Sequence, residues 1–204
     1  MILGSIGSWR ACFPRARCAN VRKVAWGDVG VKRRAPVVDA DFVHFVGLWE
    51  LNMAGCMAAT DAAFVHLRGI RVLDMTSCLQ PAITDAGLAH LVGIQKLCIY
   101  GCAQTTHTDA AFAPLQGIRV LNMGLCPQFT DAAFAHFKGI HTLITMHCNH
   151  LAITDAALAP LKGIKCLVLY YCTIPFTKVG LAHLLGISRL HMRNANAAST
   201  AAAA

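Results

Sequence analysis

Hydrophobic and polar positions follow two patterns that alternate along this chain. Residues 60–69, TDAAFVHLRG, place Phe64 and Leu67 three positions apart, which puts both side chains on one face of a helix. Residues 70–78, IRVLDMTSC, place Leu73 and Met75 two positions apart, as in a strand with one buried face. We therefore predict a short helix followed by a short strand.

The helix–strand pattern recurs at a nearly constant period. Seven units begin at Val38, Thr60, Thr84, Thr108, Thr130, Thr154 and Thr177, so the steps are 22, 24, 24, 22, 24 and 23 residues. Such a period is typical of a solenoid. Each unit can bury its hydrophobic face only against its neighbours, and the sequence therefore predicts stacked strands with continuous apolar rows between them.

Several positions set the limits of each unit. Thr can cap the helix, Asp in the first turn suits the positive end of the helix dipole, and Gly69 stands where a left-handed residue is needed. Pro114 and Pro160 are expected to weaken the last helical turn. Unit five has Thr145 where Met or Leu is expected, so its strand is expected to shift onto Met146.

The strand segments IRVLDMTSC, IQKLCIYGC, IRVLNMGLC and IKCLVLYYC resemble the core of a leucine-rich repeat, and the final Cys resembles the cysteine-containing subfamily. The resemblance covers about residues 38–195. It implies an α/β leucine-rich repeat solenoid of about seven repeats, with a concave parallel sheet and short outer helices. It also implies that one cysteine per unit points inward and bonds loop backbone: Cys56, Cys78, Cys102, Cys126, Cys148 and Cys172.

The chain divides into three parts. Residues 1–37 form a basic leader with eight basic residues against Asp28 alone, and residues 21–29 have the apolar spacing of a degenerate capping strand. Residues 38–195 form the repeat array. Unit seven, with Lys178 in place of Asp and Ala195 in place of Cys, resembles a terminal unit. Residues 196–204 form an Ala-rich tail that we expect to be frayed.

Composition favours burial without a membrane span. Hydrophobic residues make up 56% of the chain and charged residues 14%. The longest stretch without Asp, Glu, Lys or Arg in the array, residues 139–154, is too short and too polar to cross a bilayer. The basic leader is open to three interpretations: a solvated segment, an organelle-targeting sequence, or a contact with nucleic acid or another anionic surface.

Cysteine and histidine do not form a recognisable catalytic or metal motif. No zinc-like spacing, phosphate-binding loop or nucleophile elbow is found in the sequence, and we predict no metal, no cofactor and no enzymatic activity. An enzyme that used a surface thiol, Cys98 or Cys166, would require a lowered thiol pKa. An interior of free thiols suits a reducing compartment, which predicts a cytoplasmic location unless the leader directs the chain to an organelle.

The candidate binding surface is the outward face of the strands. Early units present small and polar groups there, whereas later units gather aromatic, apolar and basic ones, and the position after the strand adds His147 and Tyr171. Tyr and Arg are frequent anchors of protein interfaces. The predicted partner-binding residues are Asp74, Tyr100, Asn122, Ile144, Met146, Val168, Tyr170, Tyr171, Arg189, His191 and Arg193.

Two functions remain open from the sequence. The first is a non-catalytic protein–protein interaction module that binds a protein or peptide on its concave face. The resemblance implies, as one version, a recognition subunit of a ubiquitin ligase, although the leader does not look like an F-box. The alternative is binding of nucleic acid or an anionic surface through residues 10–34, which would be strongly salt-dependent. The sequence favours the first function, so a nucleic-acid partner is not expected.

Overall fold

A computed structural model describes residues 23–25, 37–147, 153–172 and 176–193 of the chain. The targeting and nucleic-acid predictions for the leader, the prediction of a frayed tail, and the predictions for Cys148 and Ala195 lie outside the described residues. The boundaries of the three parts remain predictions. Within the described part, none of the helices has the length and apolar character that a bilayer span requires.

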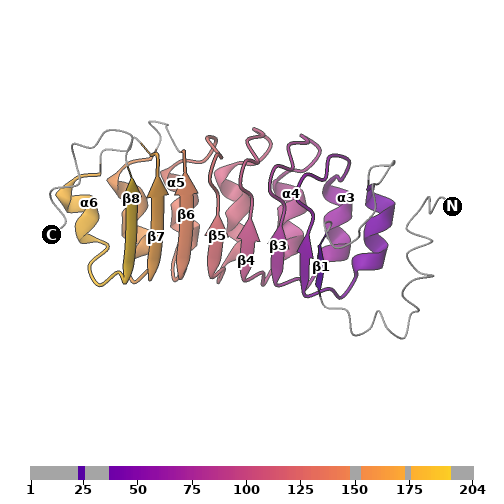
Figure 1. Cartoon of the computed structure of the whole chain (residues 1–204), viewed down its shortest axis with the longest axis horizontal. Coiled ribbons are helices and arrows are strands. Elements are labelled where there is room, and N and C mark those ends of the chain that lie inside the picture. Colours follow the sequence, from indigo (N-terminus) through magenta and orange to yellow (C-terminus); the bar gives the residue numbers. More distant parts are fainter. Residues whose placement is uncertain (1–22, 26–36, 148–152, 173–175, 194–204) are drawn as a thin grey trace.

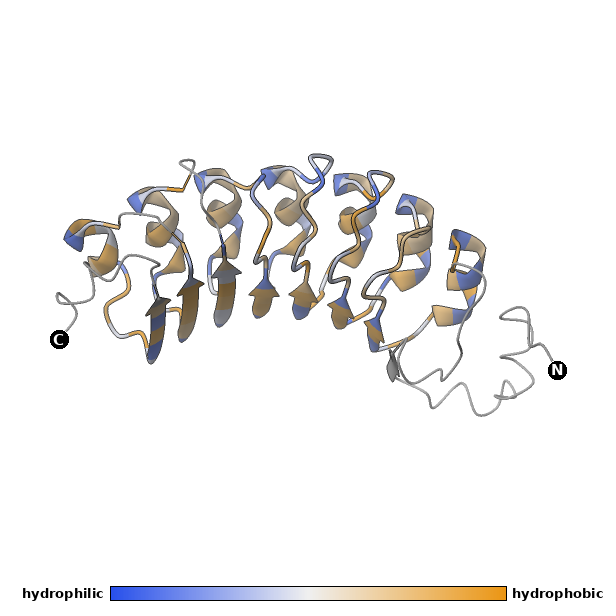
Figure 2. Ribbon diagram, turned by 45° about the horizontal axis from the view of Figure 1, so that its top comes forward, coloured by the Kyte–Doolittle hydropathy of each residue, from blue (hydrophilic) through white to orange (hydrophobic). Residues whose placement is uncertain are grey.

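Eight parallel strands form one open sheet in which each strand pairs with its neighbours in chain order (Figure 1). The strands are β1 (Lys23–Ala25), β2 (Glu50–Asn52), β3 (Val72–Asp74), β4 (Lys96–Cys98), β5 (Val120–Asn122), β6 (Thr142–Met146), β7 (Cys166–Tyr170) and β8 (Arg189–Arg193). The helices cover one side of the sheet, and the array bends so that the strands line its inner side (Figure 2). The predicted α/β leucine-rich repeat solenoid is confirmed.

The helical segments are short, and most are wound at least partly as 3₁₀ helix. They are η2 (Asp39–Phe45), α3 (Asp61–Phe64) with η3 (Val65–Leu67), α4 (Asp85–Leu88) with η4 (Ala89–Leu91), η5 (Asp109–Leu115), α5 (Asp131–Phe134) with η6 (Ala135–Phe137), η7 (Asp155–Leu161) and α6 (Lys178–Ala182). Pro114 and Pro160 lie in η5 and η7, which are 3₁₀ over all seven residues rather than weakened only in the last turn. Since η2 has the same winding without proline, proline is not its only cause.

The core lies between the sheet and the helices. The inward leucines of successive strands stand opposite one another, and each is at most 2% exposed in β2 to β7: Leu51, Leu73, Leu97, Leu121, Leu143 and Leu167. Phe64 and Leu67, predicted to share one helix face, are both buried. In the centre, the Phe112 ring packs against Phe129 and Phe137 of the next unit, with centroids 4.8 and 4.9 Å apart.

Unit five corrects one prediction. Thr145 is fully buried at the inward position opposite Leu169, and Met146 is a half-buried outward residue opposite Tyr170. The predicted shift onto Met146 is therefore wrong. A slip by one residue would turn every side chain of β6 to the other face, including Leu143, so the strand keeps its register and accepts a threonine in the core.

The aspartate at the start of each helix joins two units. Its carboxylate accepts hydrogen bonds from both the backbone N–H and the hydroxyl of the next unit's capping threonine. For Asp109 and Thr130 the distances are 2.8 and 2.6 Å. The threonine hydroxyl oxygen in turn accepts the N–H of Ala132 at 3.2 Å. We call each such pair an aspartate clamp: Asp39–Thr60, Asp61–Thr84, Asp85–Thr108, Asp109–Thr130, Asp131–Thr154 and Asp155–Thr177.

A tight turn connects each helical segment to its strand. In unit two, Arg68 has φ −56° and ψ 130°, Gly69 has φ +85°, and the N–H of Ile70 donates to the carbonyl of Leu67 at 3.1 Å. These values define a type II turn, whose third residue must have positive φ. Gly69 therefore occupies a left-handed position, as predicted.

Candidate functional site

The outward residues of the strands form straight rows across the concave face. The strand register places the middle row side by side: Asn52, Asp74, Cys98, Asn122, Ile144, Val168 and His191. These side chains are half-buried, except His191, which is exposed. The predicted residues Asp74, Asn122, Ile144, Val168 and His191 therefore belong to one continuous row.

The polar members of this row hold the backbone of their own unit. Asn52 accepts the N–H of Ala54 at 2.9 Å, and Asn122 accepts the N–H of Gly124 at 3.2 Å. Asp74 accepts the N–H and the hydroxyl of Thr76 at 2.9 and 2.6 Å. Such bonds to the second following residue form Asx-type turns. The side chains of Asp74 and Asn122 thus already serve the loop that follows each strand.

Cys98 lies beside this polar group. Its sulfur is 3.2 Å from the hydroxyl oxygen of Thr76, and because that hydroxyl donates its proton to Asp74, the thiol donates to Thr76. Burial raises the pKa of Cys98, and the nearby Asp74 carboxylate raises it further. A nucleophilic thiol needs a lowered pKa. Cys98 therefore fails the condition for the enzyme hypothesis, and it lies far from Cys166 in the row order.

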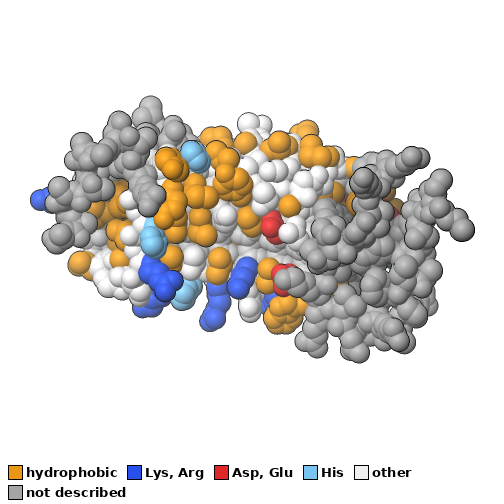
Figure 3. Space-filling model, in the orientation of Figure 1, with side chains coloured by type: hydrophobic (Ala, Val, Ile, Leu, Met, Phe, Trp, Pro, Cys, Tyr) orange, Lys and Arg blue, Asp and Glu red, His pale blue; other side chains and the backbone are white. Residues whose placement is uncertain are grey.

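The C-terminal half of the concave face is apolar (Figure 3). Tyr100 lies against the backbone of Gly124, where a Cβ atom would come within 2.8 Å of the ring and 3.3 Å of Met146. The missing side chain of Gly124 thus allows the tyrosine ring to lie across the next unit. Ile144 and Val168 adjoin in register, as do Met146 and Tyr170. These five side chains, Tyr100, Ile144, Met146, Val168 and Tyr170, are half-buried and form what we call the concave patch.

A second row follows the strands at the edge of the concave patch. Leu125, His147 and Tyr171 each have φ 55°, a left-handed conformation that few residues other than glycine adopt. Leu125 is 38% exposed, Tyr171 is 47% exposed, and the rings of His147 and Tyr171 stack with centroids 4.7 Å apart. We call these three residues the left-handed column. The sequence analysis missed Leu125, although glycine at the same position in two other units, Gly55 and Gly101, was a signal.

The basic residues of β8 do not all join the concave patch. The ring of His191 lies edge-on to Tyr170, with centroids 6.4 Å apart. Arg189 is exposed at the start of β8, opposite Cys166, whereas Arg193 pairs with Tyr170 at the end of the strand. The side chain of Arg193 lies outside the described residues. Of the predicted basic group, His191 is thus the member whose side chain contacts the patch.

The repeated cysteines have the environment that the resemblance implies. Thiols donate to main-chain carbonyl oxygens of the preceding unit, with distances of 3.3 Å for Cys78 to Met53, 3.1 Å for Cys102 to Met75 and 3.0 Å for Cys126 to Ile99. Burial raises the pKa of Cys78 and Cys126 to about 12 and that of Cys102 to about 11. These thiols are therefore protonated structural donors. Within the described part of the chain, no three His, Cys, Asp or Glu side chains gather closely enough to hold a metal ion.

Comparison with known proteins shows similarity in fold. No protein-family model and no curated protein sequence matches the chain. Among solved structures, the TLR13–ssRNA13 complex is similar with TM-score 0.62 and 18% identity over 84% of this chain and 24% of that one. The yeast Rad7–Elc1 complex is similar with TM-score 0.57 and 18% identity over 76% of this chain and 44% of that one. This chain spans less than half of either neighbour, and what it shares with them is the architecture of a leucine-rich repeat solenoid.

Proposed function

We propose that the chain is a non-catalytic protein-interaction module whose partner binds the C-terminal half of the concave face. The observation that supports this most directly is the left-handed column. A residue with a side chain in this conformation costs about 1–2 kcal/mol relative to its relaxed backbone. Gly55 and Gly101 occupy the equivalent position without that cost.

The left-handed column gains little for folding in return. Leu125 and Tyr171 keep a large part of their surface in water, so their burial does not offset the backbone strain. Bulky side chains retained at strained, exposed positions beside an apolar patch are what a binding surface requires. The function therefore resides in the concave patch and the left-handed column together.

The chemistry of this surface favours a protein or peptide partner. Neither the concave patch nor the left-handed column contains Asp, Glu, Lys or Arg. A nucleic-acid backbone would need basic residues here. Apolar and aromatic side chains, by contrast, complement a hydrophobic segment of another protein. Binding through residues 10–34 of the leader remains the alternative prediction.

The resemblance to the cysteine-containing subfamily supports a more specific version, in which this module recognises a substrate within a ubiquitin ligase. One structural neighbour, Rad7, is described in complex with another protein, Elc1. The protonated interior thiols of the array support a reducing, cytoplasmic location. Each of these finer statements depends on the binding surface and is tested after it.

The first test separates binding from stability. In the full chain, Leu125, His147 and Tyr171 are all replaced by Gly, and Ser77→Gly serves as the matched control, because Ser77 has φ 56° at the same repeat position outside the patch. We expect the triple variant to be at least as stable as the original chain, since relief of strain offsets the lost stacking, and to lose its partner in a pull-down from cell extract. The control should gain slightly in stability and keep the partner.

A stable triple variant that retains the partner would contradict the proposal. Retention by that variant, with loss of the partner only when residues 1–37 are removed, would favour the leader as the binding site. Gly124→Ala gives an independent check on the concave patch, because the added Cβ displaces the Tyr100 ring without removing any aromatic residue.

A further inference from the structure

The edge of the array where helices end and strands begin carries a chemistry unlike that of the concave patch. Six successive segments form this edge, which we call the basic rim: residues 68–72, 92–96, 116–120, 138–142, 162–166 and 185–189. They contain eight Lys or Arg and no Asp or Glu: Arg68, Arg71, Lys96, Arg119, Lys138, Lys162, Lys165 and Arg189. All are exposed except the half-buried Arg71, and Lys and Arg side chains gather along this edge in Figure 3.

The acidic groups of the array are located at the opposite edge. The clamp aspartates begin the helices and accept hydrogen bonds from the next threonine, as Asp131 does from Thr154. The charges are therefore separated across the array, although residues 38–204 together have a net charge close to zero. A basic edge this long attracts a polyanion or an anionic surface.

The outermost position of the basic rim mixes basic with apolar side chains. The residue before the left-handed glycine forms the tip of the turn in each unit: Val46, Arg68, Val92, Gln116, Lys138, Lys162 and Leu185. Val46, Val92 and Leu185 are 65%, 64% and 82% exposed, which is high for large hydrophobic residues. Trp49 lies on the same edge, 47% exposed, with the Arg71 guanidinium 5.9 Å from its ring centroid.

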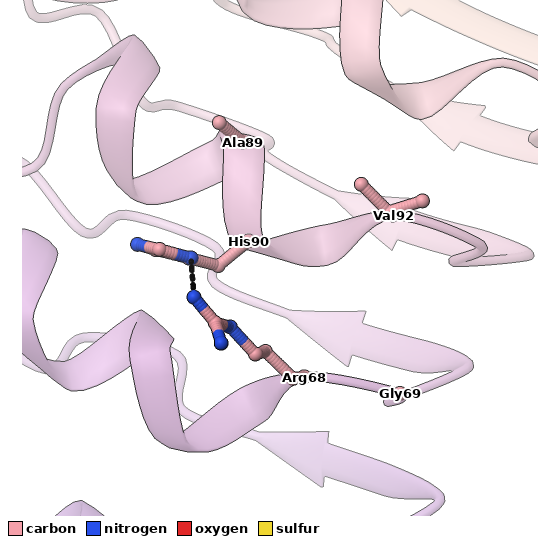
Figure 4. A pocket seen from close by; sticks show the side chains of 5 residues that line it. All are labelled: Arg68, Gly69, Ala89, His90 and Val92. Atoms are coloured by element: carbon pink, nitrogen blue, oxygen red, sulfur yellow. Dashed lines mark hydrogen bonds between the residues drawn. The ribbon is translucent and has the colours of Figure 1, made fainter.

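A shallow hollow opens on this edge between units two and three (Figure 4). It has a volume of about 350 Å³ and is lined by Arg68, Gly69, Ala89, His90 and Val92. Arg68 Nη2 lies 3.4 Å from His90 Nδ1, and because a guanidinium only donates, His90 accepts through Nδ1. The hollow thus combines a cation, a polar ring and an exposed apolar side chain at one point on the rim.

We propose that the basic rim binds the surface of an anionic lipid bilayer, with its cations at the headgroups and its apolar tips in the interfacial region. The lower ends of the strands lie close to one level (Figure 1), although the array is bent in the perpendicular direction (Figure 2). The rim is therefore an arc within a plane, and a flat surface can meet all of its units together. Interfacial binding uses both electrostatic attraction and apolar contact.

Nucleic-acid binding and helix-end stabilisation each account for less of the rim. A nucleic-acid backbone would use the cations but would leave Val92 and Leu185 without a role. Stabilisation of helix ends by basic residues accounts for Arg71, whose Nη1 donates to the carbonyl of Gly93 at 2.6 Å. The other seven cations are exposed, where such contacts add little. The inference concerns a different surface from the proposed function and does not depend on it.

Vesicle sedimentation with the full chain tests the charged component. Phosphatidylcholine vesicles with phosphatidylserine should bind the protein and those without it should not. Replacing Lys138, Lys162 and Lys165 by Gln should lower the partition coefficient about a hundredfold, since each surface lysine contributes about fivefold. The same three positions changed to Arg should bind normally, and Lys178→Gln, at the opposite edge, should have no effect.

The apolar component is tested with Val92→Ser/Leu185→Ser, for which Val179→Ser is the control because Val179 is 74% exposed on α6. We expect the double variant to lose binding several-fold at high salt and the control to bind as before. In a Trp9→Phe/Trp26→Phe variant, Trp49 is the remaining tryptophan, and lipids brominated in the acyl chains should quench its fluorescence.

Three results would overturn the proposal. One is absence of binding to phosphatidylserine vesicles. Another is vesicle binding that is unchanged by the three Lys→Gln substitutions or leaves Trp49 unquenched, since the leader would then be the contact. The third is binding of single-stranded RNA or DNA that depends on the three lysines but not on Val92 and Leu185, which would make the rim a nucleic-acid edge.

Discussion

Asp109 and Thr130 illustrate how one residue pair links two units that are distant in sequence. The carboxylate accepts two hydrogen bonds from Thr130, whose hydroxyl also caps its own helix. Hydrogen bonds to a charged group are stronger than those between neutral groups, and each of these orders a helix start as well as a contact between units. The same arrangement recurs at six junctions, so the stacking is fixed by a repeated polar contact as well as by burial.

We therefore expect Asp109→Ala to lower the free energy of unfolding by about 1–3 kcal/mol. Thr130→Ala should also destabilise the protein, because the hydroxyl donor and the helix cap are lost together. Urea unfolding of both single variants and the double variant forms a double-mutant cycle. Strictly additive effects would show that the clamp does not act as a coupled pair.

The strands separate structural from surface positions with a period of two residues. Leu121 is fully buried between Leu97 and Leu143, whereas Asn122 faces outward and holds the N–H of Gly124. Because parallel strands align these residues into rows, each outward position joins a continuous surface without further sequence information. The element scale thus determines which residues are available for binding.

The two faces should differ clearly in stability measurements. Leu121→Ala should lower the free energy of unfolding by about 2–5 kcal/mol, because it leaves a cavity in the central row. Asn122→Ala should cost much less, on the order of 1 kcal/mol for one lost hydrogen bond. Denaturant unfolding measures both. Equal and small effects would contradict the assignment of inward and outward faces.

At the scale of the whole molecule, the array ends at a unit that lacks the aspartate of the clamp. Lys178 occupies its place, while Thr177 is still held by Asp155 of the unit before. In a solenoid each unit contacts only its neighbours, so the last unit is held from one side. Unit seven is correspondingly less buried, with Leu181, Ile187 and Leu190 only partly covered.

Acid should loosen this last unit first. Hydrogen bonds from Thr177 hold the pKa of Asp155 below its ordinary value. A lowered folded-state pKa contributes stability above the unfolded-state value, about 3.9, and that contribution is lost as pH falls through the folded-state pKa. Hydrogen exchange of the α6 amides should therefore accelerate below about pH 4 in the original chain. Asp155→Asn should exchange faster at neutral pH and show a weaker pH dependence, whereas an unchanged dependence would contradict this role.

The repeat, the alternation of helix and strand, and the inward and outward positions could all be predicted from the amino-acid sequence. So could the capping threonines and the left-handed glycines. These features follow from periodicity and from backbone preferences within a few residues, which a single unit already contains. For the same reason, the concave row that includes Ile144 and Val168 could be predicted before the strands were seen side by side.

How each unit meets the next became clear only from the folded array. Asp109 looked like a helix-end charge but bonds to Thr130, Thr145 is buried where a register shift was expected, and the turn tips gather into a basic rim. Each outcome depends on residues from different units brought together by stacking. That juxtaposition is fixed by the register and curvature of the whole array, which local sequence patterns do not contain.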